Sequence, residues 1–444
     1  MTVTTTNYSE HLTSKLSFYG QLMEEFGYTS LIISSGLPKQ IFWDDNPYPF
    51  KVNIHFKALV PVSDVANSYI IFKPGNKPTL AFYQPEDYWH VVPADPKGVW
   101  VECFDIKTFR GRNDWQQFLP KNRKGLVWIG EPQEELGSLN ITSINPENLI
   151  NPIHYQRAYK SDYEVACLRQ ANLIAAKGHL AAKEAFYDGC SELEIHGAYL
   201  QASNQKEEEL PYSNIIALNE HGAVLHYTDL TRQRYAEQNI HSFLIDAGAS
   251  YLGYCSDITR TWSYKEAEFA DLIKAFDSLQ QDLIKSLVAN KSYVDMHINT
   301  HLKIAELLKE SEFIYCDADT ALETGITSTF YPHGLGHLLG LQVHDIGGQV
   351  ITPQGEINPP PTAHPFLRLT KQLEVGFCIT LEPGLYFIDL LLNKLKRTKN
   401  AEFINWTKVE NFKKFGGIRI EDDLIIKQDG VENLTRDAFN LCLK

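Results

Sequence analysis

Four carboxylic acids in the C-terminal half of this 444-residue chain have the types and surroundings that a metal site requires. Each stands within an apolar, strand-like run: Asp246 in SFLIDAGA, Asp257 in SDITRTW, Glu382 in FCITLEPGLYF and Glu421 in GIRIEDDLII. Because a buried, unpaired carboxylate is costly, such residues are paired, protonated or bound to metal. With one imidazole they form a hard, oxygen-rich donor set, which favours two Mn²⁺-like ions about 3.5–4 Å apart over a structural zinc.

Asp246 and Asp257 are expected to face each other across a hairpin. A short Gly-containing connection joins their two runs, and a turn centred between Tyr251 and Leu252 places them in direct register. Their Cβ atoms would then lie roughly 5 Å apart. Like charges at that separation are unfavourable unless a proton or a cation lies between them. Either residue alone could be a turn or surface aspartate, but the mirrored pair favours a metal.

Three histidines, His333, His337 and His344, lie within the segment FYPHGLGHLLGLQVHD. Its glycines argue against a regular helix, so it is not the helical HExxH device, and they allow the backbone to approach a site closely. Neutral imidazole is a good ligand for Mn, Co, Zn and Fe. An isolated histidine is more often structural, whereas three in one Gly-rich segment favour a ligand. For Glu421, the two aspartates that follow it leave a solvated acidic cap as an alternative.

The elements that position these residues are predicted to form two domains. Short β-branched and aromatic segments between turn-forming residues occupy about 28–131, which indicates a small α/β domain. We expect a boundary near residue 158, with an N-terminal domain of 1–158 and a catalytic domain of 159–444. The strand-like segments of the first domain are SLIISSG, HFKALVPV, SYIIFKP, PTLAFYQP and GLVWIGE.

The second domain is predicted to be mixed α+β, with helices covering a sheet. Ser161, followed three residues later by Glu164, is a capping-box start for a helical pattern that runs to about Tyr187. Strands are expected in the four runs that carry the acids. Further helical patterns occupy about 192–206, 266–289 and 295–310.

Composition excludes several classes of function. With 55 acidic and 41 basic residues the formal charge is −14, and without a Lys/Arg-rich run the chain lacks the basic surface of a nucleic-acid binder. Its start lacks a signal peptide's basic and apolar regions, and no apolar run reaches the ~18–20 residues that span a bilayer. The seven cysteines include no CxxC pair, so we expect free thiols in a reducing, cytoplasmic compartment.

Several motifs occur together in a characteristic order along the chain. They are WDDNPYPFKVN, LIDAGA, DITRT, PHGLGH, GLQVHD, TLEPGLYFID and FGGIRIEDD. In this combination the chain resembles the pita-bread metallopeptidases, which have a creatinase/aminopeptidase-like catalytic domain. Within them it resembles the bacterial Xaa-Pro dipeptidases (prolidases) and their close relatives, the organophosphorus acid anhydrolases. The resemblance covers essentially the whole chain.

The resemblance implies a role for individual residues. It places metal ligands at Asp246, Asp257, His337, Glu382 and Glu421, with Asp257 and Glu421 shared by both ions. By the same resemblance, Glu382, His344 and His333 are catalytic. The substrate contacts that it implies are His226, Arg368, Arg419, Tyr212, Leu225, Tyr293, Val343, Leu367 and Asp45, the last contributed by a partner subunit. From residue chemistry alone, His226 could be a core histidine, Arg368 a surface ion-pair partner and Tyr293 ordinary packing.

The expected activity is hydrolysis of Xaa-Pro dipeptides by an enzyme with two divalent ions per chain, for which Mn²⁺ fits best. A water shared by the ions would be deprotonated to hydroxide and attack the scissile carbonyl. The resemblance also implies a homodimer, with the N-terminal domain supplying dimer contacts and covering the active site. The alternatives are organophosphorus acid anhydrolase as the main activity, aminopeptidase P, and a metal-free binding protein of the same fold.

Overall fold

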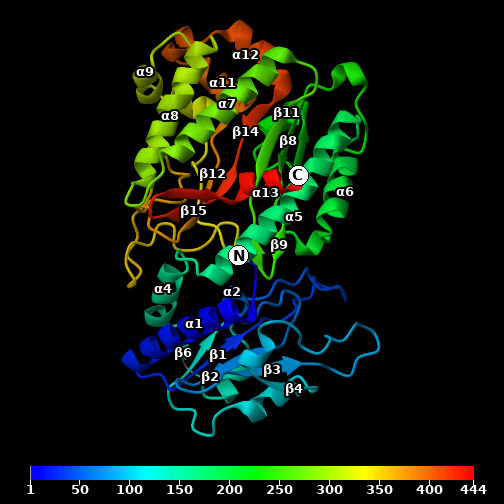
Figure 1. Ribbon diagram of the computed structural model, residues 1–444, viewed down its shortest axis with the longest axis vertical. Helices are drawn as coiled ribbons and strands as arrows, with labels where there is room; N and C mark the ends of the chain where they lie inside the picture. Colours follow the sequence, from blue (N-terminus) through cyan, green and yellow to red (C-terminus); the bar gives the residue numbers. More distant parts are fainter. Residues whose placement is uncertain (1, 142) are drawn as a thin grey trace. The chain divides into compact units, whose positions relative to one another are not determined.

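The computed structural model describes residues 2–141 and 143–444 of the chain (Figure 1). It divides into two compact units. The first comprises residues up to Gln156 together with 161–167 and 352–356, and the second comprises 157–160, 168–351 and 357–444. Every helix that the structure describes is too short or too polar to span a lipid bilayer.

The first unit is built on a six-stranded mixed sheet in the order β4-β3-β2-β1-β5-β6. The β1–β2 and β2–β3 pairs are antiparallel, and the other pairs are parallel. Tyr69, Trp115 and Trp128 pack together in its hydrophobic interior. The strands are β1 Ser30–Ser34, β2 Tyr69–Phe72, β3 Thr79–Tyr83, β4 Asp105–Phe109, β5 Leu126–Ile129 and β6 Ser143–Ile144, and the helices are α1 Thr5–Glu25, α2 Ile54–Lys57, α3 Glu135–Ser138 and α4 Glu147–Gln156.

Four of the five strand-like segments expected in this unit form strands, namely β1, β2, β3 and β5. The fifth, HFKALVPV, was expected as a strand and this is wrong, because it begins in helix α2. The side chain of Asn53 caps that helix by accepting a hydrogen bond from the backbone nitrogen of His55 at 3.0 Å. Phe56, Leu59 and Val60 are fully buried, and their spacing is that of one helix face.

Helix α5 (Asp162–Tyr187) begins in the first unit, which includes residues 161–167, and continues into the second unit, which carries the remaining helices. The hydrogen bond from the backbone nitrogen of Ser161 to the Glu164 carboxylate (3.0 Å) and the reciprocal bond from Glu164 to the Ser161 hydroxyl (3.4 Å) confirm the predicted capping box. The other predicted helical ranges correspond to α6, α7 and α8. The helices are α5 Asp162–Tyr187, α6 Glu192–Ser203, α7 Ala267–Lys285, α8 Tyr293–Glu310, α9 Ala318–Glu323, α10 Ile326–Phe330, α11 Asp389–Leu395, α12 Trp406–Phe412 and α13 Leu434–Cys442.

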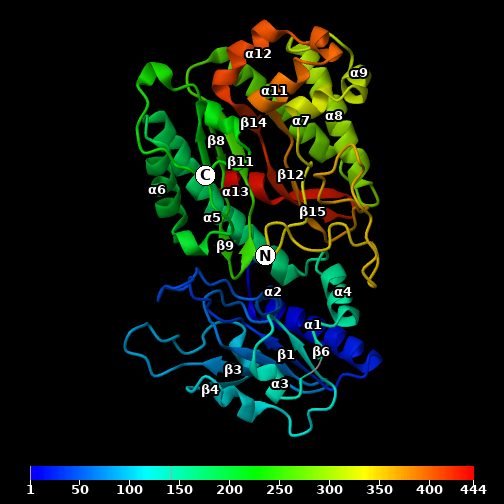
Figure 2. The ribbon, with the colours of Figure 1, turned by 180° about the vertical axis from the view of Figure 1, so that it is seen from behind.

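Short antiparallel strands run between these helices, which confirms the mixed α+β class. Figure 2 shows α5 and α6 on one side of β8 and β11, with α7 and α8 on the other. One sheet has the order β11-β8-β7, a second has the order β12-β15-β16, and β13 pairs with β14. The strands are β7 Ile215–Leu218, β8 Ser242–Asp246, β9 Ser250–Tyr251, β10 Tyr254–Cys255, β11 Thr259–Ser263, β12 Cys378–Leu381, β13 Gly384–Tyr386, β14 Gly417–Arg419, β15 Asp422–Lys427 and β16 Gly430–Asn433.

The hairpin that links β8 to β11 has a different register from the one expected. Asp246 pairs with Thr259, so the predicted direct pairing of Asp246 with Asp257 is wrong. The turn is displaced because Leu252 (φ 49°) and Gly253 (φ 88°) both adopt left-handed conformations and form its two central residues. Asp257 precedes Thr259 by two residues, and side chains two apart in extended chain share a face. The two aspartates therefore remain on the same side of the sheet.

Candidate functional site

The four acids and His337 converge in the second unit. The hydroxyl oxygen of Tyr212 lies 2.7 Å from Asp246 Oδ1 and 2.5 Å from Asp257 Oδ1. His337 Nε2 lies 3.3 Å from Asp257 Oδ2 and 3.7 Å from Glu382 Oε1. One ligand atom each from Asp257, His337 and Glu421 fall within 4.8 Å of one another. The structure thus brings all five expected ligands into one cluster.

Each acid stands where a strand ends or changes its partner. Asp246 is the last residue of β8, and Asp257 lies two residues before β11. Glu382 lies between β12, which pairs with β15, and β13, which pairs with β14. Glu421 lies between β14 and β15. These two strands are the pairing partners of β13 and β12, so Glu421 lies at the matching break. Breaks in pairing allow these carboxylates to leave the regular alternation of the sheets and point at a common centre.

His337 is carried by an extended segment that pairs with β12. The backbone nitrogen of Thr380 donates to the His337 carbonyl at 2.9 Å, and Leu338 bridges Ile379. Gly336 is required here, because a Cβ at this position would lie 2.3 Å from the Thr380 carbonyl oxygen. The expectation that this segment is not helical is confirmed.

The imidazole of His337 is oriented by its own neighbour. Its Nδ1 lies 3.0 Å from the Leu338 carbonyl oxygen, so Nδ1 holds the proton and donates it to that carbonyl. Nε2 therefore faces the acids, where it can carry a proton to Asp257 or, once deprotonated, offer its lone pair to a metal, which is the arrangement usual for a metal-binding histidine. Burial by itself would lower the pKa of His337, but the hydrogen bond with Asp257 leaves it raised.

The acids carry more negative charge than the protein neutralises at this place. Burial, together with repulsion among the acids, raises the pKa of Asp257, raises that of Glu382 to about 7 and raises that of Glu421 well above its usual range. Carboxylates in such surroundings are stabilised by a cation. The donor set of four carboxylates and one neutral imidazole fits a pair of divalent ions.

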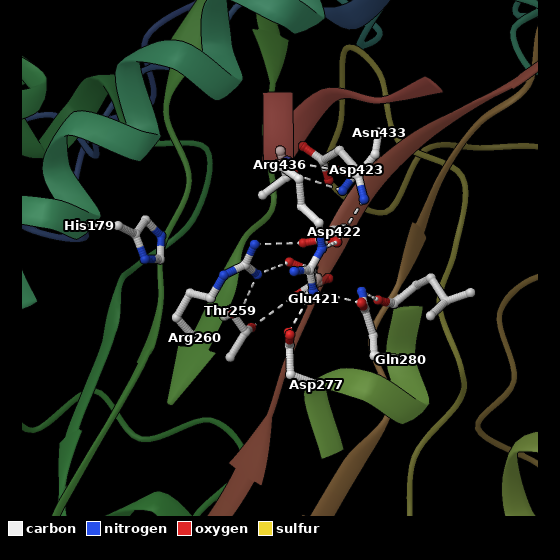
Figure 3. Close-up of polar contacts among 12 residues, drawn as sticks. His179, Thr259, Arg260, Asp277, Gln280, Glu421, Asp422, Asp423, Asn433 and Arg436 are labelled. Atoms are coloured by element: carbon white, nitrogen blue, oxygen red, sulfur yellow. Dashed lines mark hydrogen bonds and ion pairs between the residues drawn. The ribbon is translucent and has the colours of Figure 1, made fainter. Parts of the chain in front are cut away.

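A second charge network surrounds Asp422, the first residue of β15 (Figure 3). Arg260 Nη2 and Arg436 Nε each donate to Asp422 at 2.7 Å, and Asn433 Nδ2 donates to it at 2.8 Å. Burial alone would raise the pKa of Asp422, but the two guanidinium groups lower it to about 2. Arg260 Nη1 also donates to the backbone carbonyl of Glu421 at 2.7 Å. The network therefore fixes the backbone beside that acid.

The three consecutive acids 421–423 are all buried, so the alternative of a solvated acidic cap is wrong. Side chains alternate along a strand, which places Asp422 toward the arginines and its neighbours toward the metal centre. Asp423 Oδ2 accepts the backbone N–H of Asp257 at 3.1 Å, and the Thr259 hydroxyl donates to Glu421 Oε2 at 2.7 Å. Sequence reasoning missed both Asp423 and Thr259 as supports, although each lies two positions after a residue that it had selected, Glu421 and Asp257 respectively.

Arg419 contacts both an expected ligand and a tyrosine of the cluster. Its Nη2 donates to Asp246 Oδ2 at 2.7 Å, and its Nη1 donates to the Tyr386 hydroxyl at 2.7 Å. That hydroxyl also lies 2.9 Å from His333 Nε2, and His333 Nδ1 lies 3.7 Å from Glu382 Oε2. Tyr386 was not selected from the sequence, although it stands in the same TLEPGLYF run as Glu382. It links an arginine and a histidine that were both expected at the site.

The other residues expected at the site differ in their solvent exposure. His344 is exposed, and its ring centroid lies 4.5 Å from that of His337. Arg368 and His226 are exposed, and Val343 and Leu225 are half-buried. Tyr293 and Leu367 are fully buried in the interior, where the Tyr293 hydroxyl donates to the Thr380 carbonyl at 2.8 Å. Asp45 belongs to the first unit, where its side chain is exposed.

Comparison with known proteins agrees with this architecture. Residues 6–155 match the N-terminal domain of Xaa-Pro dipeptidase, and residues 166–428 match metallopeptidase family M24. A Xaa-Pro dipeptidase of Pseudoalteromonas haloplanktis is 48% identical over 433 residues, which cover 97% of this chain and 98% of that protein. One from Aeromonas hydrophila is 44% identical over 431 residues, covering 97% of this chain and 98% of that protein.

Solved structures show the same fold at low sequence identity. Zinc-substituted aminopeptidase P of Escherichia coli, in complex with product, aligns with a TM-score of 0.71 at 20% identity, over 100% of this chain and 99% of that one. The aminopeptidase PepP of Pseudomonas aeruginosa aligns with a TM-score of 0.72 at 20% identity, over 99% of this chain and 96% of that one. The expected pita-bread fold is confirmed. The chain belongs to the Xaa-Pro dipeptidases of metallopeptidase family M24.

Proposed function

We propose that this chain hydrolyses Xaa-Pro dipeptides with two divalent cations, for which Mn²⁺ is the best candidate. The observation that carries the proposal is the convergence of four carboxylates on His337 Nε2. The ions are assigned to Asp246, Asp257, His337, Glu382 and Glu421, with Asp257 and Glu421 shared by both. The names of the relatives, which are 44–48% identical along nearly their whole length, support the substrate class.

When bound, two such ions supply a lowered pKa for water and polarise the scissile carbonyl. Glu382 is the proposed proton carrier, because it is half-buried and so faces the site with part of its surface free. Its carboxylate accepts the proton of the attacking water and delivers it to the proline nitrogen. That delivery is needed because the nitrogen of an Xaa-Pro bond must be protonated before it can leave.

Substrate positioning is assigned to the exposed residues. Arg368 has no carboxylate within 4 Å in the described parts of the chain, so its guanidinium is free to hold the C-terminal carboxylate of the dipeptide in a two-pronged contact. His344 is placed to donate to the oxyanion that develops on the carbonyl. His333, His226, Leu225, Val343 and Tyr212 are proposed to surround the scissile bond, with Tyr293 and Leu367 supporting them from the interior. Arg419 is proposed to hold Asp246 in position.

The test is an assay of metal-stripped and Mn²⁺-reloaded protein on Xaa-Pro dipeptides, matched Xaa-Pro-Yaa tripeptides and an organophosphate ester. We expect stripping to abolish dipeptide cleavage and reloading to restore it. Full activity of the stripped protein would contradict the proposal. Equal efficiency on dipeptides and tripeptides would replace it with aminopeptidase P, whose solved structures share the fold. Hydrolysis of the organophosphate is proposed only as a side activity, which the same panel measures.

Three further assignments accompany the proposed activity. We assign the domains to 1–158 and 159–444 and propose a homodimer, in which Asp45 is contributed to the partner's site. All seven cysteines are free thiols, which supports a reducing, cytoplasmic location. Sedimentation analysis of the Mn²⁺-loaded protein tests the dimer, and a monomer under assay conditions would contradict it. A non-catalytic role is disfavoured, because no ligand position is substituted.

A further inference from the structure

Three histidines form a second cluster in the same unit, outside the acidic centre. His297 and His301 lie one turn apart on α8, and His364 comes from the segment that precedes Arg368. One ring nitrogen from each falls within 4.8 Å of the others. The ring centroids are 4.6–4.7 Å apart in all three pairs. None of the three belongs to the set of acids and histidines assigned to the peptidase centre.

The separation of the nitrogens suits coordination of one ion. His297 Nε2 and His301 Nε2 are 3.2 Å apart and share a hydrogen bond, whose proton a bound ion would replace. Two ligands at the usual Zn–N distance of about 2.0–2.1 Å on a tetrahedral ion lie about 3.3–3.4 Å from each other. Both side chains are 1% exposed, and His364 is half-buried. The helix therefore holds two of the rings rigidly, while the third closes the cluster from outside.

Hydrogen bonding directs the lone pair of His301 Nε2 into the cluster. His301 Nδ1 lies 3.0 Å from the Thr327 hydroxyl, and with the Nδ1 proton donated there, Nε2 keeps its lone pair for the cluster. His297 Nδ1 is buried and has no hydrogen-bond partner in the described parts of the chain. Burial and, to a smaller extent, the neighbouring histidines together lower the pKa of His297 to about 2 and that of His301 to about 3. All of this keeps the rings neutral, and neutral imidazole is the metal-binding form.

A cavity of about 170 Å³ gives room for an ion and a further ligand. It is lined by the three histidines together with Tyr331 and His333. The Tyr331 hydroxyl is buried and without a hydrogen-bond partner among the described residues. A water occupies about 30 Å³ in the liquid, so a water or hydroxide can complete the coordination of an ion held by three nitrogens. No carboxylate pairs with any of the three rings in the described parts of the chain.

We propose that His297, His301 and His364 bind one transition-metal ion of the Zn²⁺ class, separate from the ions of the acidic centre. Three neutral nitrogens favour Zn²⁺, Co²⁺, Ni²⁺ or Cu²⁺ over the harder Mn²⁺ and Mg²⁺. The acidic centre, with four carboxylates, has the opposite preference. The chain thus carries two sites that sort ions by ligand chemistry, and His333 borders the cavity of one while it approaches the general base of the other.

The first experiment counts zinc in the full-length, Mn²⁺-loaded protein after equilibration with Zn²⁺ and removal of weakly bound ions. We expect His364→Gln to hold one zinc per chain fewer than the unmodified protein. His241→Gln is the matched control, because His241 is also half-buried but lies outside the cluster, and it should hold the same amount as the unmodified protein. Circular dichroism verifies that both variants are folded. Equal zinc in the unmodified protein and folded His364→Gln overturns the proposal.

A second measurement needs no variant. X-ray absorption at the zinc edge reports only zinc, so it distinguishes this site from an acidic centre filled with Mn²⁺. We expect three imidazole nitrogens at about 2.0–2.1 Å. An oxygen-dominated shell, or release of Mn²⁺ in proportion to the zinc bound, shows zinc entering the acidic centre instead and overturns the proposal. Both measurements detect bound zinc and do not depend on peptidase activity. They therefore test this site even if the protein does not cleave Xaa-Pro dipeptides.

Discussion

Glu382 is the most exposed of the proposed ligands. Asp257, Glu421 and His337 are buried, whereas the Glu382 side chain retains 19% of its surface and the Asp246 side chain, which is paired with Arg419, retains 14%. A carboxylate that touches both the centre and the open site is placed to move a proton between water and the leaving nitrogen.

We expect Glu382→Gln to reduce kcat by roughly 10²–10⁴-fold, because the proton transfer is lost, with a much smaller change in KM. Steady-state kinetics on a Xaa-Pro dipeptide, with metal content measured in parallel, provide the check. Retained metal and kcat with only a raised KM would show that Glu382 binds substrate and carries no proton.

Arg368 is predicted to set the length of the substrate. Its contact with a free carboxylate forms only when proline is the last residue, and loss of a charge-assisted contact costs roughly 1.5–3 kcal/mol. We expect at least about tenfold higher kcat/KM for Ala-Pro than for Ala-Pro-Ala, and we expect Arg368→Ala to narrow that gap by damaging the dipeptide reaction. Ala-Pro-amide is the control for charge. A gap that survives in Arg368→Ala would mean that another group reads the carboxylate.

Among individual residues, the sequence was most informative about acids that interrupt apolar runs. Acids within apolar runs, such as Glu382, stand out because burial of an unpaired charge is so costly. Thr259 and Tyr386 do not stand out, because a threonine and a tyrosine are ordinary in strands. Their roles come from partners distant in the sequence, Glu421 for one and Arg419 for the other, and no local pattern encodes such a pairing.

Among the elements, α6 anchors residues 218–231, the segment that carries Leu225 and His226, through hydrogen bonds. Its first residue, Glu192, is fully buried and accepts hydrogen bonds from the backbone nitrogens of Leu218 (2.9 Å) and Thr231 (2.7 Å). The same carboxylate is 2.7 Å from His221 Nδ1. One helix terminus therefore fixes both ends of a segment that lacks regular structure over much of its length.

This arrangement predicts a pH-dependent stability. The hydrogen bond with Glu192 raises the pKa of His221 above its ordinary 6.5. A group whose pKa is raised by folding stabilises the fold fully below its unfolded pKa and loses that contribution as pH rises through the folded pKa. We expect the free energy of unfolding of the unmodified protein to be about 1 kcal/mol higher than that of His221→Gln below pH 6.5. Above pH 6.5 this difference should shrink progressively.

Urea unfolding of both proteins across that pH range measures the difference, with His241→Gln as a control outside this contact. A difference that stays constant or grows with rising pH would contradict the assigned ion pair. Either result leaves the catalytic assignments untouched, because His221 contacts no proposed ligand in the described hydrogen bonds.

Prediction of the elements succeeded where capping and periodicity agreed. The Ser161 and Glu164 pair located the start of α5, and the 3.6-residue pattern located α7 and α8. The hairpin after β8 was misplaced because its turn depends on a left-handed Leu252, a conformation that leucine rarely adopts. Only Gly253 is of a type that favours such a turn, and one glycine can occupy either of its central positions, so residue types did not decide where the turn is centred.

For the molecule as a whole, all five proposed metal ligands lie in the second unit, and we expect the two units to unfold in transitions of their own. Metal bound at 100 times its dissociation constant stabilises the binding unit by about 2.7 kcal/mol, which corresponds to roughly 5–10 °C in its transition. We expect chelation to lower the transition of the second unit by about this amount and to leave that of the first unchanged.

Two optical signals separate the units in that experiment. Five of the seven tryptophans, including the buried Trp115 and Trp128, belong to the first unit, whereas most helical residues belong to the second. Tryptophan fluorescence should therefore show little response to chelation and far-ultraviolet circular dichroism a large one. Equal shifts in both signals would show that the units unfold together.

Most of the architecture at this scale came from motifs read in order along the chain. The family and the pita-bread fold followed from that order and are confirmed. The order of the strands in the first unit could not be anticipated, because β4 is exposed along most of its length and β6 has only two residues. Neither offers the apolar run by which a strand is recognised.

The position of Glu421 near the end of the chain has a consequence for protein synthesis. Its strand is secured by residues that lie later still, since Arg436 holds Asp422 and the Thr435 hydroxyl accepts the backbone N–H of Asp423. A nascent chain on the ribosome therefore cannot secure this strand until residues 435 and 436 have emerged. A product that stops between Asp423 and Thr435 would carry Glu421 but lack the two contacts that hold its neighbours Asp422 and Asp423.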